Sequence, residues 1–197
     1  MLVGDTSVGK SCLIRNYLEN SFSDDYEPTV LDIYKGTKNV KNKQIEIEIH
    51  DTSGDQQLGV NRATQYKGAD VFMICVAVNS RSSFENIANW KLEISNNEPH
   101  KPIMVILTKS DLVDYVDDAV TFDEIKQQKE DQGFQGCSQT SSKVWEDFNV
   151  HKAFVQAICT GYYDKYELKL GQWIYTTPRH IQILIKLPSL SLPVLIQ

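Results

Sequence analysis

The chain has 197 residues, and 41% of them are apolar, which is enough to bury one substantial core. Its formal net charge of −6 argues against a nucleic-acid-binding surface. The four cysteines contain no C-x-x-C pair, so we expect reduced, mostly buried thiols in a cytoplasmic protein. The apolar runs are too short to span a membrane. The sequence therefore predicts one domain followed by a tail.

The first motif in the chain is a phosphate-binding loop. It follows the pattern G-x-x-x-x-G-K-[ST] over Gly4, Asp5, Thr6, Ser7, Val8, Gly9, Lys10 and Ser11. Its two glycines let the backbone wrap around a phosphate chain, with successive N–H groups forming an anion-binding nest. Lys10 would reach the β- and γ-phosphates, and the Ser11 hydroxyl would ligate Mg²⁺. Apolar spacing predicts a helix from about Lys10 to Asn20, whose positive dipole end would face the same phosphates.

Strand patterns follow this helix. Residues 29–35 and 44–50 read as two strands joined by a polar turn at 38–43, and the second alternates apolar with acidic residues. Residues 71–78 and 103–107 are continuous apolar runs, which are typical of central parallel strands covered on both faces.

Helix patterns lie between and after these strands. Residues 82–94 have helical apolar spacing, Thr121 to Glu124 forms a capping-box signature, and residues 147 to about 163 form a closing amphipathic helix. Strands that alternate with helices predict a doubly wound α/β sheet. Such a sheet binds ligands at the carboxyl ends of its strands.

Three polar segments follow predicted strands at that edge. Asp51-Thr52-Ser53-Gly54 offers a carboxylate for a Mg²⁺ shell and a glycine N–H for a γ-phosphate. Thr108-Lys109-Ser110-Asp111 offers a carboxylate that would accept two hydrogen bonds from guanine, a donor pair that adenine lacks. Residues 139–143 offer backbone amides for guanine O6. Taken alone, the first segment is more often an ordinary turn than a metal site, and the third is only a polar loop.

Together the motifs resemble those of a known family. GDTSVGKS, YEPTV, DTSG, TKSD and TSSK, in this order and at these intervals, resemble the small GTPases of the Ras superfamily over residues 1–160. The resemblance implies a P-loop NTPase fold, a small G domain with a six-stranded, mostly parallel sheet flanked by helices. It also implies GTP or GDP and Mg²⁺ as cofactors. Residues 161–197 would be an extension, in which Ile181, Ile183, Ile185 and Leu187 alternate as in a strand.

The resemblance also assigns roles to single residues. Ser11, Thr29 and Asp51 would ligate the metal, Phe22 would pack on the guanine, and Lys109 would lie along the base. The residues expected at the catalytic position are Lys10, Thr29, Gly54, Asp55 and Gln56. The residues expected to bind the nucleotide are Gly4, Asp5, Thr6, Ser7, Val8, Gly9, Lys10, Ser11, Cys12, Phe22, Thr29, Gly54, Thr108, Lys109, Asp111, Leu112, Ser141, Ser142 and Lys143.

The subtype signals point in two directions. The segment Tyr26 to Tyr34 and the threonine that opens TKSD look most like the Rho branch, whereas TSSK looks like the Ras and Rab pattern. The helical insert that Rho proteins carry between these two motifs is not present at full length. We expect a Rho-like protein, with a Rab-like trafficking GTPase as an alternative.

Two residues depart from the pattern of relatives that are active in hydrolysis. Asp55 stands after Gly54, where such relatives have a glutamine that orients the attacking water. A shift by one residue would bring Gln56 into that role. Thr6 stands where Ras and Rho proteins usually have glycine, and its side chain would crowd an incoming arginine finger. Hydrolysis is therefore expected to be slow, and a GTP-locked, effector-binding protein is the alternative. Asp111 disfavours a P-loop ATPase or kinase.

The chain ends give further expectations. The first strand is expected to be truncated, because only Met1-Leu2-Val3 precedes the phosphate-binding loop. No prenylation motif is present at the C-terminus, so no lipid anchor is expected. We expect a cytoplasmic monomer, peripheral to membranes only through partners. Effectors and regulators would bind two loops, residues 22–34 (the first switch loop) and residues 54–66 (the second switch loop).

Overall fold

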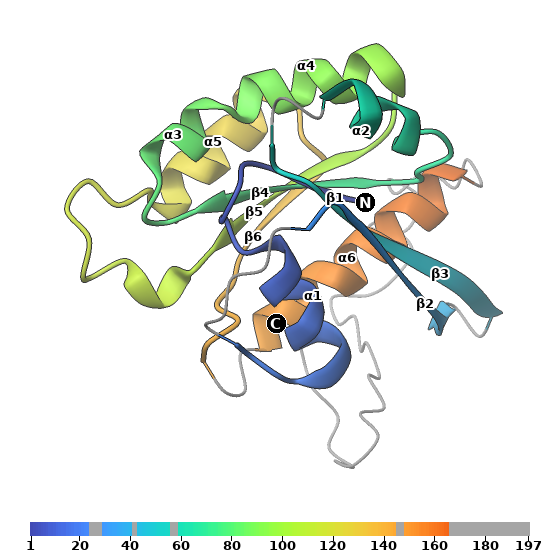
Figure 1. Cartoon of the computed structure of the whole chain (residues 1–197), viewed down its shortest axis with the longest axis horizontal. Coiled ribbons are helices and arrows are strands. Elements are labelled where there is room, and N and C mark those ends of the chain that lie inside the picture. Colours follow the sequence, from blue (N-terminus) through green and yellow to red (C-terminus); the bar gives the residue numbers. More distant parts are fainter. Residues whose placement is uncertain (24–28, 41–42, 56–58, 145–147, 166–197) are drawn as a thin grey trace, which may run out of the picture.

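The computed structural model describes residues 1–23, 29–40, 43–55, 59–144 and 148–165 (Figure 1). In these residues six strands form one sheet in the order β2-β3-β1-β4-β5-β6. Their bounds are β1 (Leu2–Val3), β2 (Leu31–Val40), β3 (Lys43–Thr52), β4 (Phe72–Ala77), β5 (Ile103–Thr108) and β6 (Gly136–Gln139). Only β2 and β3 pair antiparallel, and the other neighbours are parallel. This arrangement confirms the predicted doubly wound α/β fold.

Helices cover both faces of the sheet (Figure 1). The described helices are α1 (Lys10–Glu19), α2 (Gly59–Gln65), α3 (Arg81–Glu85), α4 (Ile87–Asn97), α5 (Phe122–Gln132) and α6 (Phe148–Lys165), with a 3₁₀ turn, η2 (Ser110–Leu112). The face with α3, α4 and α5 buries Trp90, Ile94 and Ile125 against the sheet. The opposite face buries Leu13 of α1 and Phe154 of α6.

The central strands are apolar throughout because both of their faces are covered. In β4, Phe72, Ile74 and Val76 belong to the core on the α4 side, whereas Met73 and Cys75 belong to the core on the α1 and α6 side. All six residues of β4 and of β5 are buried. The predicted central strands are thus confirmed. In the short strand β1, Leu2 pairs with β3 on one side, and Leu2 and Val3 pair with β4 on the other.

Two predicted elements differ in extent. Strand β2 begins at Leu31, so Thr29 precedes it, and β2 and β3 stay paired as far as Val40 and Lys43. The polar turn predicted at 38–43 is therefore shorter, because cross-strand hydrogen bonds extend the ladder through polar residues. The helix predicted at 82–94 is two helices that meet at Asn86. The apolar period continues across this break and does not reveal it.

Other predictions concern caps, cysteines and the tail. The capping box of α5 is present, with Thr121 and Glu124 each bonding the other's backbone. The expectation of mostly buried cysteines is wrong: all four are reduced, but only Cys75 is buried and the others are half-buried. Residues 145–147 and the tail from 166 lie outside the described residues, as does Gln56. In the described part, none of the helices is long and apolar enough to cross a membrane.

Candidate functional site

A cavity of about 530 Å³ lies at the carboxyl edge of the sheet. The predicted site residues that line it are Thr6, Ser7, Gly9, Lys10, Ser11, Cys12, Phe22, Thr29, Gly54, Asp55, Thr108, Lys109, Asp111, Leu112, Ser142 and Lys143. Gly4, Asp5, Val8, Asp51 and Ser141 are not in its lining. Each of them is hydrogen-bonded to a residue that lines it. The structure thus gathers segments that are far apart in the sequence into one hollow.

The phosphate-binding loop has the backbone that its glycines predict. Gly4 and Gly9 have φ of 135° and 95°, in the left-handed region. A Cβ at Gly4 would lie 2.4 Å from the carbonyl oxygen of Cys75, so only glycine fits there. Lys10 is buried, and its Nζ donates to the carbonyl oxygens of Gly4 and Asp5 at 2.8 and 2.9 Å. Burial lowers the pKa of Lys10, since desolvation disfavours the ammonium.

The three predicted metal ligands lie together. Ser11 Oγ donates to Asp51 Oδ2 at 2.5 Å and lies 3.0 Å from Thr29 Oγ1. Asp51 is fully buried, and its Oδ1 has no hydrogen-bond partner among the described residues. Burial raises the pKa of Asp51, although the Ser11 hydrogen bond opposes this. A buried carboxylate beside two hydroxyls is an oxygen donor set that suits Mg²⁺. The residues present therefore fit the metal that the motif implies.

The far end of the cavity carries the predicted base-recognition residues. Asp111 Oδ1 accepts a hydrogen bond from Ser141 Oγ at 2.5 Å. Ser141 Oγ in turn accepts from the backbone N–H of Lys143 at 3.2 Å. Lys109 Nζ donates to the carbonyl oxygen of Ser7 at 2.8 Å, which ties this end to the phosphate-binding loop. Lys143 Nζ lies 5.9 Å from the centre of the Phe22 ring. One carboxylate oxygen of Asp111 is therefore fixed by the protein itself.

Gly54 lies directly against the phosphate-binding loop. A Cβ at this position would lie 2.4 Å from both the carbonyl carbon of Asp5 and the backbone nitrogen of Thr6. Only glycine allows this approach of two backbones. The next residue, Asp55, is exposed and lines the cavity, and its backbone N–H donates to Ser53 Oγ at 3.2 Å.

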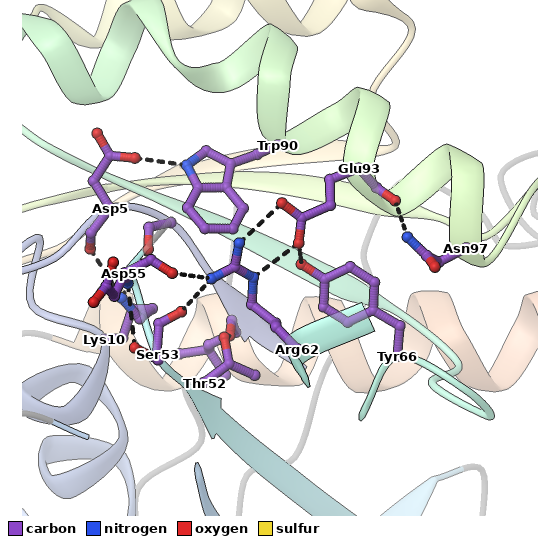
Figure 2. A network of polar contacts seen from close by, with 12 residues as sticks. Asp5, Lys10, Thr52, Ser53, Asp55, Arg62, Tyr66, Trp90, Glu93 and Asn97 are labelled. Carbon is purple, nitrogen blue, oxygen red and sulfur yellow. Dashed lines mark hydrogen bonds and ion pairs between the residues drawn. The ribbon is translucent and has the colours of Figure 1, made fainter. Parts of the chain in front are cut away.

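Sequence reasoning missed a polar network behind this contact (Figure 2). It joins Asp5 of the phosphate-binding loop, Arg62 of α2, Tyr66 just after α2, and Trp90 and Glu93 of α4. Trp90 was recognisable only as an apolar residue of a helix. Arg62 and Glu93 lie 31 positions apart and belong to no motif, so no local signal reveals that they pair.

The match to a known protein family agrees with this geometry. A model of the Ras family matches residues 1–161.

The chain belongs to the Ras family.

This Ras-family protein is thus a small GTP-binding switch built on a P-loop fold. Ras-family GTPases bind guanine nucleotides, generally with Mg²⁺, and interact with regulators and effectors. The match covers the strands and helices that form the cavity and stops within α6.

Proposed function

We propose that this Ras-family protein is a Rho-like signalling switch that binds GTP and GDP with Mg²⁺ and hydrolyses GTP slowly. One observation carries the proposal: the cavity joins a phosphate-binding loop and an oxygen donor set at one end to the carboxylate of Asp111, in the turn just after β5, at the other. This spacing suits a nucleotide that carries both phosphates and a guanine.

In this proposal each end of the cavity has its own chemistry. Lys10 and the N-terminus of α1 would hold the phosphates, and Ser11, Thr29 and Asp51 would hold the metal. When bound, Mg²⁺ neutralises phosphate charge. Asp111 would accept the two guanine donors, and adenine would leave this carboxylate unpaired. Residues 1–160 would form the G domain, and residues 161–197 an extension to it.

The rate of hydrolysis separates two forms of the proposal. As an enzyme, the protein would turn over GTP with help from an activator that supplies the missing groups. As a GTP-locked module, it would remain bound to GTP and act as a constant ligand for effectors. We favour the slow enzyme, because Lys10, Ser11, Thr29 and Gly54 all line the cavity, where they would stabilise charge on a phosphate chain.

Two measurements test the proposal. Fluorescent GDP should bind the purified protein and be displaced by GTP, whereas ATP at the same concentration should not displace it. Equal displacement by ATP and GTP would refute the assignment. Analysis of the nucleotide that copurifies with the protein, followed by single-turnover hydrolysis, then separates the enzyme from the locked module.

A further inference from the structure

Helix α4 holds the phosphate-binding loop from behind. Trp90 Nε1 donates to Asp5 Oδ1 at 2.7 Å, as Figure 2 shows. Asn86, which precedes α4, donates from Nδ2 to the other oxygen, Asp5 Oδ2, at 2.8 Å. Both carboxylate oxygens of Asp5 are therefore occupied by donors from one side of the sheet. Charge-assisted hydrogen bonds of this kind fix geometry as well as contributing energy.

The same helix holds the Gly54 loop through an arginine. Arg62 is only 2% exposed, and its Nε and Nη2 donate to the two oxygens of Glu93 in α4 at 2.8 and 2.9 Å. Its Nη1 donates to the carbonyl oxygens of Ser53 and Asp55 at 3.0 and 2.8 Å. One guanidinium thus ties the residues on both sides of Gly54 to α4.

Two further contacts close this network. The Arg62 guanidinium carbon lies 4.5 Å from the centre of the Trp90 ring, within reach of a cation–π interaction. Tyr66 OH donates to Glu93 Oε1 at 2.8 Å. Burial alone would lower the pKa of Arg62, but its pairing with Glu93 raises it, so the guanidinium stays charged. Trp90 therefore contacts both Asp5 of the phosphate-binding loop and Arg62, which binds the residues on either side of Gly54.

The two held loops meet at one point. Gly54 packs on the peptide between Asp5 and Thr6, with no room for a Cβ. Residues of α4 hold both sides of that contact: Trp90 holds Asp5, and Glu93 holds Arg62. A change in any of these contacts would alter the spacing between Gly54 and the phosphate-binding loop.

We propose that Arg62 and Asp5 are positioning residues through which α4 sets the preference of the site for a nucleoside triphosphate over a diphosphate. The inference rests on the proposed function, in which the Gly54 N–H meets the γ-phosphate. Only the triphosphate has that group, so loss of the network lowers the affinity for GTP and leaves the affinity for GDP nearly unchanged. Because the network is formed within the folded chain, the loop is ordered before the ligand binds, which lowers the cost of binding.

The test is the affinity of the full chain for GDP and for a non-hydrolysable GTP analogue. Arg62→Ala should weaken the analogue about tenfold or more, the effect of losing charged hydrogen bonds, and change GDP by no more than about twofold. Arg62→Lys keeps the charge but loses the forked pair of donors, so its affinity for the analogue should lie between those of the wild type and Arg62→Ala. Arg81→Ala is the matched control, since Arg81 is likewise an ion-paired arginine, bonded to Asp118 and Glu124, but lies outside the cavity lining. It should change neither affinity.

A milder variant covers the case in which Arg62→Ala does not fold. Trp90→Phe keeps a ring against Arg62 but loses the Nε1 donor to Asp5, and it should weaken the analogue selectively, about threefold or more. Equal loss of GDP and analogue, or no loss of either, in the folded variants overturns the inference. Absence of guanine-nucleotide binding in the wild type would instead refute the proposed function, so the two failures are distinguishable.

Discussion

Asp55 is the residue at which we expect this protein to depart from the hydrolysis chemistry of its family. Its side chain is exposed at the cavity, one residue after a glycine that packs on the phosphate-binding loop. A carboxylate has no N–H to orient water, and it adds negative charge beside a phosphate that is already anionic. Because this side chain is exposed and the backbone of the residue is held by Ser53 and Arg62, its substitution should leave the core intact.

Asp55→Gln should therefore raise the single-turnover rate of GTP hydrolysis on the order of tenfold or more. The gain should be larger when Thr6→Gly is also present, because both residues border the same phosphate and need not act independently. Thr6→Gly alone serves as the control. A wild-type rate typical of the family, unchanged by Asp55→Gln, would show that Gln56 or another group orients the water.

Asp111 offers a test at the other end of the cavity. Asp111→Asn should weaken GTP about 10- to 100-fold, because an amide cannot accept both guanine donors. The same variant should gain affinity for xanthosine triphosphate, whose O2 would accept from the amide. Competition of both nucleotides against fluorescent GDP measures the change. If Asp111→Asn bound guanine and xanthine nucleotides as the wild type does, Asp111 would not contact the base.

At the scale of elements, a strand or a helix end could be predicted where residues close in the sequence determine it. The strands β4 and β5 follow from unbroken apolar runs, and the cap of α5 follows from Thr121 and Glu124, three positions apart. The end of α3 at Asn86 could not be predicted, because the Asn86 side chain donates a hydrogen bond to Asp5, 81 positions away. Periodicity records which face is buried and carries no information on such distant polar partners.

The candidate site divides in the same way. Most of the residues that line the cavity could be predicted, because they lie in short motifs that follow strands. The second layer could not: Arg62 and Glu93 have no motif, and their pairing depends on how α2 and α4 pack. Sequence alone also gave Asp5 no partner, although both of its carboxylate oxygens are held in the fold.

The contact between α1 and α6 gives a pH prediction. His151 of α6 is half-buried, with its ring 5.0 Å from that of Tyr17 in α1, and burial and Lys38 lower its pKa below 6.5. The unfolded chain then binds more protons just below pH 6.5, so stability is fully present above that pH and falls as the pH falls further. His151→Gln should flatten this dependence.

Denaturant unfolding between about pH 5 and 7.5, where histidine titrates, measures the slope. His100→Gln is the matched control, since His100 is exposed. The slope should remain in that variant. An unchanged slope in His151→Gln would assign the pH dependence to other groups.

At the scale of the whole molecule, ligand binding and stability are one equilibrium. The cavity is built from both switch loops, the phosphate-binding loop and the base motifs, so a bound nucleotide bridges segments from most of the domain. A ligand at 100 times its dissociation constant stabilises the folded state by about 2.7 kcal/mol. Metal removal should reduce this stabilisation, because the buried carboxylate of Asp51, beside Ser11, would lose the cation that we propose it helps to hold.

Chelation of Mg²⁺ should therefore lower the melting temperature of the protein bound to a GTP analogue more than that of the GDP form. The expected reason is Thr29. Its Oγ1 lies 3.0 Å from Ser11 Oγ, and the residue precedes β2, so we expect it to ligate the metal only when a γ-phosphate holds its loop in place. Thr29→Ala should remove the difference between the two nucleotides, whereas Ser11→Ala should reduce the metal effect in both. Thermal unfolding with and without chelator measures all of these cases. A metal effect that is equal for the two nucleotides in the wild type would show that Thr29 is not a state-dependent ligand.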